Sequence, residues 1–177
     1  MTKHATLLWV DLEMTGLDST KDRILEVAAI ATDWQFQEFA SLETVIHQPP
    51  RVLRTMDEWC KTQHGASGLT ERVQQSKMNE KEAEQLLVEL VAAHFDKDKK
   101  VILAGNSIHQ DRKFIARYWP TLDAHLHYRM LDVSAWKVVF EGRYRRAFAK
   151  PEEHRALEDI RGSIDELKYY LGKVRVS

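Results

Sequence analysis

Residues 7–18 read LLWVDLEMTGLD, an apolar run that leads into acidic residues. The apolar run predicts a strand over about residues 6–12, and Asp11 and Glu13 are two positions apart, so both carboxylates lie on one face of that strand. No basic residue lies between them. Two anions held this close at the edge of a core repel each other and lose hydration unless a cation neutralises them. The stretch therefore predicts a strand that presents two carboxylates to a metal ion.

Two more acids have similar surroundings further along the chain. Asp111 lies in AGNSIHQDRKF (104–114), at the start of a segment with apolar residues at helical spacing. Asp159 lies in EEHRALEDI (152–160) and flanks an apolar helical stripe. An isolated acid is usually solvated, but each of these lies beside predicted buried structure. Four carboxylates predict two divalent ions, and ligands that are all oxygen favour Mg²⁺ or Mn²⁺.

His154 precedes Asp159 by five residues. Five helical positions turn the chain by about 500°, so the two side chains would diverge if both were helical. We therefore place His154 on the preceding loop or first turn, where it can act as a general base over the acids; the alternative is a solvated histidine at a helix start. Zinc is less favoured, because Cys60 has no paired thiol and no HExxH or CxxC occurs.

Composition fits a single intracellular enzyme domain. The 177 residues are 44% hydrophobic and 30% charged, and they contain one cysteine, which excludes an intrachain disulfide. No apolar stretch is long enough for a membrane span or a signal sequence, so we expect a cytoplasmic protein, with an organellar pool such as a mitochondrial one left open. A net charge of −1 argues against broad electrostatic capture of long nucleic acid.

The pattern along the chain predicts an α/β fold with a mixed sheet and helices on its faces. Strands are predicted near 6–12, 24–33, 38–47, 101–104 and 129–133. Helices are predicted after a capping box at Asn79 and Glu82, around Asp111, after a Ser134 cap, and over about 155–171. No repeat or linker divides the chain, which predicts one domain over 1–177 with its core at about 6–172.

Four motifs in this order resemble those of oligoribonuclease, a DEDD exonuclease family with a histidine in its last motif. They are DLEMTGLD (11–18), GNSIHQD (105–111), HYRMLDVS (127–134) and HRALEDI (154–160). The resemblance runs from about Leu7 to Tyr170, and Met14 distinguishes the first motif from that of proofreading exonucleases, which more often have threonine there. It implies a ribonuclease-H-like fold and 3′→5′ hydrolysis of very short RNA oligomers to 5′-mononucleotides.

The same resemblance implies roles for residues outside the acids. Base pockets are implied for Leu17, Trp59 and His64, and a cap around the terminal 5′ phosphate is implied for Ser107, Arg129 and Ser134. Tyr128 matches a tyrosine tied to activity that reaches the site of a neighbouring subunit, so a homodimer is implied. From the residues alone, Trp59 is equally well read as a core residue or as a stacking platform.

The segment 140–153, which contains EGRYRRAFAK, departs from the family pattern: it is shorter than in many relatives and lacks their usual tryptophan. Its basic residues form either a local phosphate-binding patch or a solvated loop; they are Arg143, Arg145, Arg146 and Lys150.

Two other functions compete with the hydrolysis of short RNA oligomers. One is a DNA-directed DEDD exonuclease acting on longer 3′ ends, which would need an open groove where the cap is placed. The other is an inactive nuclease-fold binding module, whose mark would be a missing metal ligand.

Overall fold

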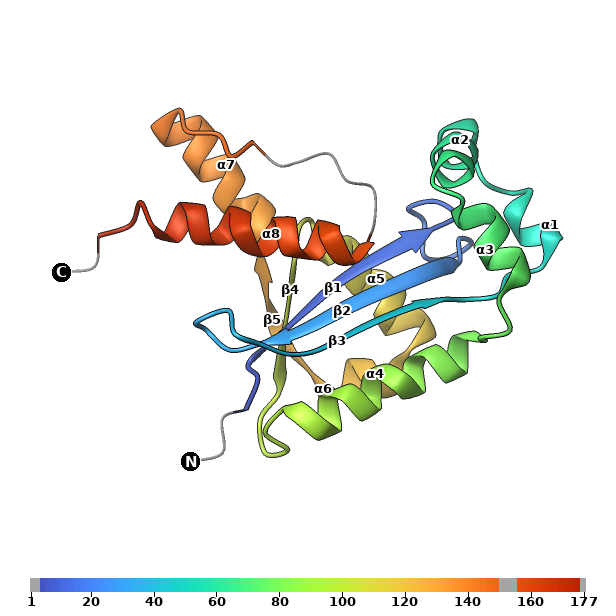
Figure 1. Cartoon of the computed structure of the whole chain (residues 1–177), viewed down its shortest axis with the longest axis horizontal. Coiled ribbons are helices and arrows are strands. Elements are labelled where there is room, and N and C mark those ends of the chain that lie inside the picture. Colours follow the sequence, from blue (N-terminus) through green and yellow to red (C-terminus); the bar gives the residue numbers. More distant parts are fainter. Residues whose placement is uncertain (1–3, 150–155, 176–177) are drawn as a thin grey trace.

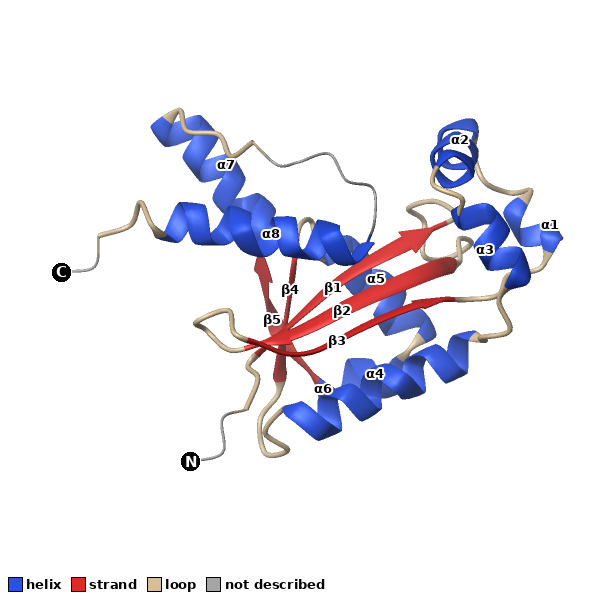
Figure 2. Ribbon diagram, viewed as in Figure 1, coloured by secondary structure: helices blue, strands red, loops and turns tan. Residues whose placement is uncertain are grey.

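In the computed structural model, which describes residues 4–149 and 156–175, the predicted strands form one five-stranded sheet (Figures 1 and 2). The strands are β1 (Leu7–Met14), β2 (Ile24–Thr32), β3 (Glu38–Val45), β4 (Val101–Gly105) and β5 (Leu126–Asp132). Their order is β3-β2-β1-β4-β5. β1, β2 and β3 pair antiparallel, whereas β4 runs parallel to β1 and β5 parallel to β4. The mixed sheet confirms the predicted fold class.

Helices cover both faces of this sheet and one of its ends (Figure 2). α4 (Glu80–His94), α5 (His109–Tyr118) and α6 (Pro120–His125) lie on one face, and α7 (Val133–Tyr144) and α8 (Ala156–Leu171) lie on the other. Three short helices form a small cluster around Leu25; they are α1 (Pro50–Leu53), α2 (Glu58–Ala66) and α3 (Leu69–Gln75).

Alternation along β1 divides its side chains between two cores. Leu8, Val10 and Leu12 pack with α4 and α5, while Leu7 and Trp9 pack with α7 and α8. A strand covered on both faces reads as a continuous apolar run rather than as an alternating one. This explains why β2, with all nine residues buried, has the sequence ILEVAAIAT. The edge strand β3, in contrast, has no fully buried residue.

Side-chain hydrogen bonds to the backbone fix the starts of α4 and α7. The predicted capping box is confirmed: Asn79 Oδ1 accepts from the backbone N–H of Glu82, and Glu82 Oε2 accepts from that of Asn79, each at 2.9 Å. The prediction that Ser134 caps α7 is wrong, because the N-cap is Asp132, whose carboxylate accepts from the N–H of Ser134. Both residue types are good caps, and the strand ends one residue earlier than predicted. Among the described helices, none is both long and apolar enough to cross a membrane.

Candidate active site

The first two acids occupy the carboxyl end of the central strand. Asp11 and Glu13 continue the face of Leu7 and Trp9, so they point toward the side of the sheet covered by α8. Both are half-buried, where the strand leaves the core. The sequence prediction that they share one face of a strand is confirmed.

The third acid is fixed against the same strand from α5. Asp111 is buried in the first turn of that helix, and its Oδ1 accepts a hydrogen bond from the backbone N–H of Leu12 at 3.0 Å. This N–H is available because β4 pairs with β1 only as far as Trp9, which leaves the edge of β1 open beyond that point. The carboxylate of Asp111 therefore reaches the backbone between Asp11 and Glu13.

Burial raises the pKa of Asp111 to about 7, and the nearby charges of Glu13 and Asp132 add to the effect. The hydrogen bond from Leu12 partly opposes this shift, because it stabilises the charged form. Asp111 is thus a carboxyl group that resists ionisation near neutral pH unless positive charge is brought close to it.

The fourth acid lies at the start of the last helix. Asp159 lies half-buried in the first turn of α8, which packs on β1 and β2 through Ala156 and Ile160. His154 lies outside the described residues. Among residues 4–149 and 156–175, no three histidine, cysteine, aspartate or glutamate side chains stand close enough to form a ready-made metal group.

His64 contacts the site from α2. Its ring is buried, Nε2 lies 2.9 Å from the carbonyl oxygen of Met14, and Nδ1 lies 3.9 Å from Oε2 of Glu13. The resemblance places His64 in a base pocket; the structure puts it beside the second acid, where it joins α2 to the end of β1.

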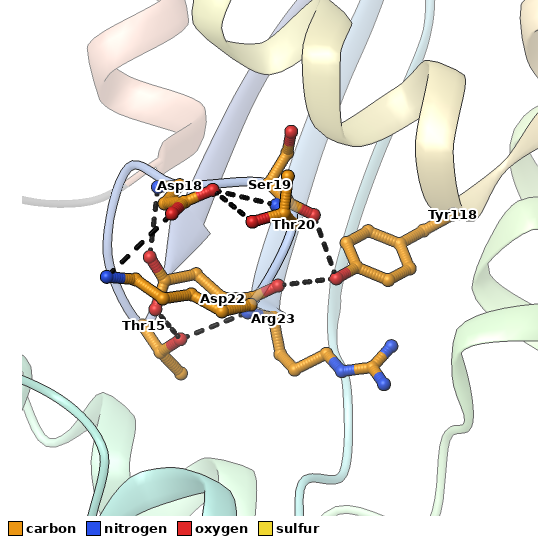
Figure 3. A network of polar contacts seen from close by, with 8 residues as sticks. Thr15, Asp18, Ser19, Thr20, Asp22, Arg23 and Tyr118 are labelled. Atoms are coloured by element: carbon orange, nitrogen blue, oxygen red, sulfur yellow. Dashed lines mark hydrogen bonds and ion pairs between the residues drawn. The ribbon is translucent and has the colours of Figure 1, made fainter.

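A hydrogen-bonded loop presents Leu17 to solvent (Figure 3). Within it, Asp22 accepts from the Thr15 hydroxyl at 3.1 Å and from the N–H of Asp18 at 2.9 Å. The hydroxyl of Tyr118, from α5, donates to the carbonyl oxygens of Ser19 and Asp22 at 3.1 and 2.8 Å. The loop that carries Leu17 is therefore attached to the helix that carries Asp111.

Trp59 is an exposed side chain on α2, not a core residue. It is 68% exposed, and Leu17 is 65% exposed. Single exposed apolar side chains are common on protein surfaces, so the position of these two decides what their exposure means. Figure 1 shows α2, the helix that carries Trp59, near the arrowhead of β1. Leu17 follows the end of β1 by three residues, so both side chains belong to the end of the sheet where Asp11 and Glu13 lie.

Two of the predicted phosphate-cap residues come together beyond β4. The oxygens of Ser107 and Ser134 are 3.2 Å apart, and the N–H of Ser107 donates to Ser134 Oγ at 2.9 Å. Ser107 has a positive φ of 50°, a conformation that non-glycine residues rarely adopt. Arg129 is exposed on β5, and none of its hydrogen bonds in the described structure joins it to these serines. Its guanidinium instead lies 5.3 Å from the centre of the Tyr128 ring, which is 74% exposed.

A polar network that local sequence patterns did not reveal connects this cap to α8. Asn106 Nδ2 donates to Ser163 Oγ at 2.8 Å and to Glu166 at 3.3 Å, while its Oδ1 accepts from the Ser134 hydroxyl at 3.3 Å. Ser163 in turn donates to the carbonyl oxygen of Asp159 at 2.8 Å.

Comparison with known proteins gives close relatives along nearly the full chain. The model of the RNase T exonuclease family matches residues 8–167. An oligoribonuclease of Marinobacter nauticus is 47% identical over 175 residues, which cover 96% of each chain. An oligoribonuclease of Chromobacterium violaceum is 48% identical over 169 residues, which cover 93% of this chain and 92% of that one.

Solved structures with the same fold include exonuclease I. The enzyme of Methylocaldum szegediense gives a TM-score of 0.68 at 15% identity and covers 96% of this chain and 41% of its own. Escherichia coli exonuclease I, in a complex with a dT13 oligonucleotide, gives 0.68 at 16% identity and covers 97% of this chain and 41% of its own. The chain thus spans about two fifths of exonuclease I, and at this identity the likeness shows the fold alone.

Proposed function

The chain belongs to the oligoribonuclease family of exonucleases, and from that membership we propose that it removes nucleotides from the 3′ end of short RNA oligomers and releases 5′-mononucleotides. The observation that carries the proposal is the meeting of β1 and α5. Asp111 is bonded to the backbone between Asp11 and Glu13, so an acid distant in sequence is held beside this pair where β1 and β4 separate. In α/β sheets, such a separation at the carboxyl ends of strands is where ligands bind.

Asp11, Glu13, Asp111 and Asp159 are the proposed ligands of two divalent ions, Mg²⁺ or Mn²⁺. The donor set fits hard cations, since all its ligands are carboxylate oxygens. The raised pKa of Asp111 fits as well, because a nearby cation would favour its charged form. Such ions, when bound, supply positive charge that activates water and stabilises the leaving oxygen. A zinc-bound structure is known for the exonuclease I–single-stranded DNA complex of Escherichia coli.

His154 is proposed as the general base that takes a proton from the attacking water. Its place in the chain, shortly before Asp159 at the start of α8, supports this role. An imidazole that titrates near neutrality is suited to the task.

The exposed residues supply the proposed substrate contacts. Leu17 and Trp59 offer apolar surface for bases, and His64 fixes the strand end beside them. Ser107, Ser134 and Arg129 are proposed to hold the terminal 5′ phosphate. The carboxylate of Asp132 accepts the backbone N–H groups of Ser107 and Ser134 and so fixes the two serines side by side. Their hydroxyls would contact the phosphate together with the Arg129 guanidinium, and the Ser134 hydroxyl would exchange its bond to Asn106 for one to the phosphate. A cap that closes on a terminal phosphate favours short chains, because no path remains for further nucleotides.

The exposed edge strand β5 supports a proposed homodimer. Tyr128 is 74% exposed there and stacks on His127 with ring centres 4.5 Å apart. A tyrosine held outward from an edge strand can extend into a second copy, which is the activity-linked role proposed for it.

We also propose a single exonuclease domain with its core at about 6–172, acting in the cytoplasm.

The DNA-directed alternative rests on likeness to exonuclease I at 15–16% identity, whereas the oligoribonuclease relatives are 45–48% identical. An inactive binding module would lack a metal ligand, and all four acids are present.

The proposed function is tested by incubating the protein with 5′-labelled RNA of two to about twenty nucleotides, with Mg²⁺, Mn²⁺ or chelator. We expect metal-dependent loss of 3′ nucleotides, fastest on the shortest chains. Faster cutting of long DNA would support the DNA-directed alternative, and no cutting with either metal would support the binding module.

A further inference from the structure

A cavity of about 690 Å³ opens between α7 and the segment that follows α8. Its lining residues are Ala135, Trp136, Val139, Phe140, Tyr144, Arg146, Lys173, Val174 and Arg175. Asp159 lies in the first turn of α8, whereas the cavity residues 173–175 follow its last turn, about 18 Å further at 1.5 Å per residue. The other wall of the cavity runs along α7 from Ala135. Figure 1 shows the end of α7 and the C-terminal segment on the opposite side of the molecule from α2. The cavity is thus separate from the acids.

Aromatic rings form one wall of the cavity. Trp136, Phe140 and Tyr144 are four residues apart on α7, so they lie on one face of the helix. The ring centres of Trp136 and Phe140 are 6.3 Å apart, and those of Phe140 and Tyr144 are 5.3 Å apart. Phe140 is anchored in the core by stacking on Tyr170 at 4.7 Å, while Tyr144 is 58% exposed. The wall is therefore held from behind and open in front.

The charged residues of the cavity are all cations. Arg146, Lys173 and Arg175 line it, and the described lining residues include no acid; Glu141 of α7 is not among them. Arg145 ends the helix with a positive φ of 52°, and the N–H of Arg146 donates to the carbonyl oxygen of Phe140 at 3.0 Å. The chain turns back there, which places Arg146 on the cavity side.

We propose that this cavity is a second nucleotide-binding site, in which a base stacks on Trp136 or Tyr144 and a phosphate is held by Lys173, Arg175 and Arg146. Stacking surface beside cations is the combination that binds single nucleotides and strands without sequence preference. The volume is within the range of small-molecule sites. A second copy of the chain is disfavoured as the occupant, because a two-fold interface apposes the same patch on both copies and so brings like charges together. The inference does not depend on catalysis by the acids.

Photolabelling tests the location of the site. The full chain is irradiated with 8-azidoadenosine 5′-monophosphate in chelator, and the labelled peptides are identified by mass spectrometry. We expect label on the Trp136 or Tyr144 side chain itself, in both the parent and the Asp11→Asn variant, and much less label with 8-azidoadenosine, which lacks the phosphate. Label confined to the peptides of Leu17 and Trp59 would overturn the proposal, and so would equal labelling by the nucleoside.

Charge removal tests the chemistry. Lys173→Ala/Arg175→Ala should weaken the binding of adenosine monophosphate at this site at least about tenfold, because hydrogen bonds to charged groups are each worth about 1.5–3 kcal/mol. The matched control is Lys97→Ala/Lys99→Ala, which removes two exposed lysines before β4 and should change neither labelling nor affinity. Competition experiments distinguish a mononucleotide from a nucleic-acid strand as the natural occupant. A twelve-nucleotide RNA that displaces the label at far lower concentration than adenosine monophosphate identifies a strand-binding groove. Equal potency of the two competitors identifies a mononucleotide site. Unchanged affinity in the cavity variant, or a change in its oligomer mass instead, contradicts the proposal.

Discussion

Asp111 Oδ1 accepts a hydrogen bond from the backbone N–H of Leu12 at 3.0 Å, across 99 positions of sequence. This bond places a buried carboxyl group next to Glu13, and burial together with that charge raises its pKa to about 7. The ionisation of this carboxyl group, which is fixed to the backbone of β1, is thus unfavourable without a cation.

Asp111→Asn should stabilise the metal-free protein above pH 7 and leave its stability unchanged near pH 4. The carboxyl pKa is 3.8 in the reference state and about 7 when folded, so between these values the folded protein holds the extra proton. Stability therefore falls as pH rises through this window and levels off above it. The shift corresponds to at most about 4 kcal/mol, and we expect about 1–3 kcal/mol after local relaxation. The free energy of unfolding, measured with urea in chelator at pH 4 and 8, gives this difference. Parallel pH profiles of stability for parent and variant would refute the prediction.

Asp11→Asn and Asp159→Asn should each lower turnover of a dinucleotide by about 10³-fold or more, because each removes a proposed metal ligand. Unfolding midpoints should not fall, since replacing a crowded anion relieves repulsion. Asp165→Asn is the matched control, an exposed acid on α8 paired with Lys168. Near-normal turnover in either site variant, or turnover of the parent in excess chelator, would exclude the proposed metal site.

His154→Ala should lower kcat about 10²–10⁴-fold with little change in metal or substrate binding, as for a lost general base. The rise of the parent rate with pH should disappear in the variant. His125→Ala, at the exposed end of α6, serves as the control. A variant with parental kcat and pH profile would return His154 to a solvated role.

Arg129→Ala should remove the preference for a 5′-phosphorylated dinucleotide over its unphosphorylated form. A charge-assisted contact to phosphate is worth about 1.5–3 kcal/mol, or roughly 10–150-fold in rate. Rates on both substrates, compared with those of the exposed control Arg54→Ala, give the result. If the parent cuts both forms equally and also cuts long RNA, the cap is absent and the groove is open.

Arg72→Met should destabilise the fold by about 2–4 kcal/mol. Glu26 is buried directly opposite Glu13 across β1 and β2, and Arg72 Nη1 lies 2.6 Å from its Oε1. Removing the partner leaves a buried carboxylate uncompensated, although half-exposure of the arginine moderates the cost. The double variant Glu26→Gln/Arg72→Met should recover most of the loss in urea unfolding. A double variant no more stable than Arg72→Met alone would show that the pair is not the cause.

Local patterns were enough to predict the architecture. The apolar run before Asp11 and the Val-, Ile- and Ala-rich stretch after Ile24 predicted the central strands, and the capping box at Asn79 predicted the start of α4. Such features depend only on residues that are close in sequence, so they can be predicted from a single sequence. The cap of α7 was misassigned because Asp132 and Ser134 are both capping residues, and only the backbone geometry decides between them.

Contacts between distant segments were not predictable. Nothing near Asn106 indicates that it bonds Ser163, and nothing near Glu26 indicates Arg72 as its partner. The burial of His64 beside Glu13 was likewise hidden, because a histidine among polar residues reads equally well as exposed. These contacts depend on how the elements are brought together, which the periodicity of any one segment does not encode.

The order of the acids along the chain has a consequence for synthesis. Asp11 emerges early, but α8, which carries Asp159 and covers Leu7 and Trp9, is the last element of the fold. Domains fold as units during translation, and an incomplete one exposes apolar surface. A nascent chain that ends before α8 therefore lacks both its fourth carboxylate and the cover for one face of its sheet, so it is expected to be inactive and prone to aggregate or to be captured by chaperones. Nuclease activity would then arise only after α8 has been synthesised, which protects the RNA near a translating ribosome from enzyme that still lacks this helix.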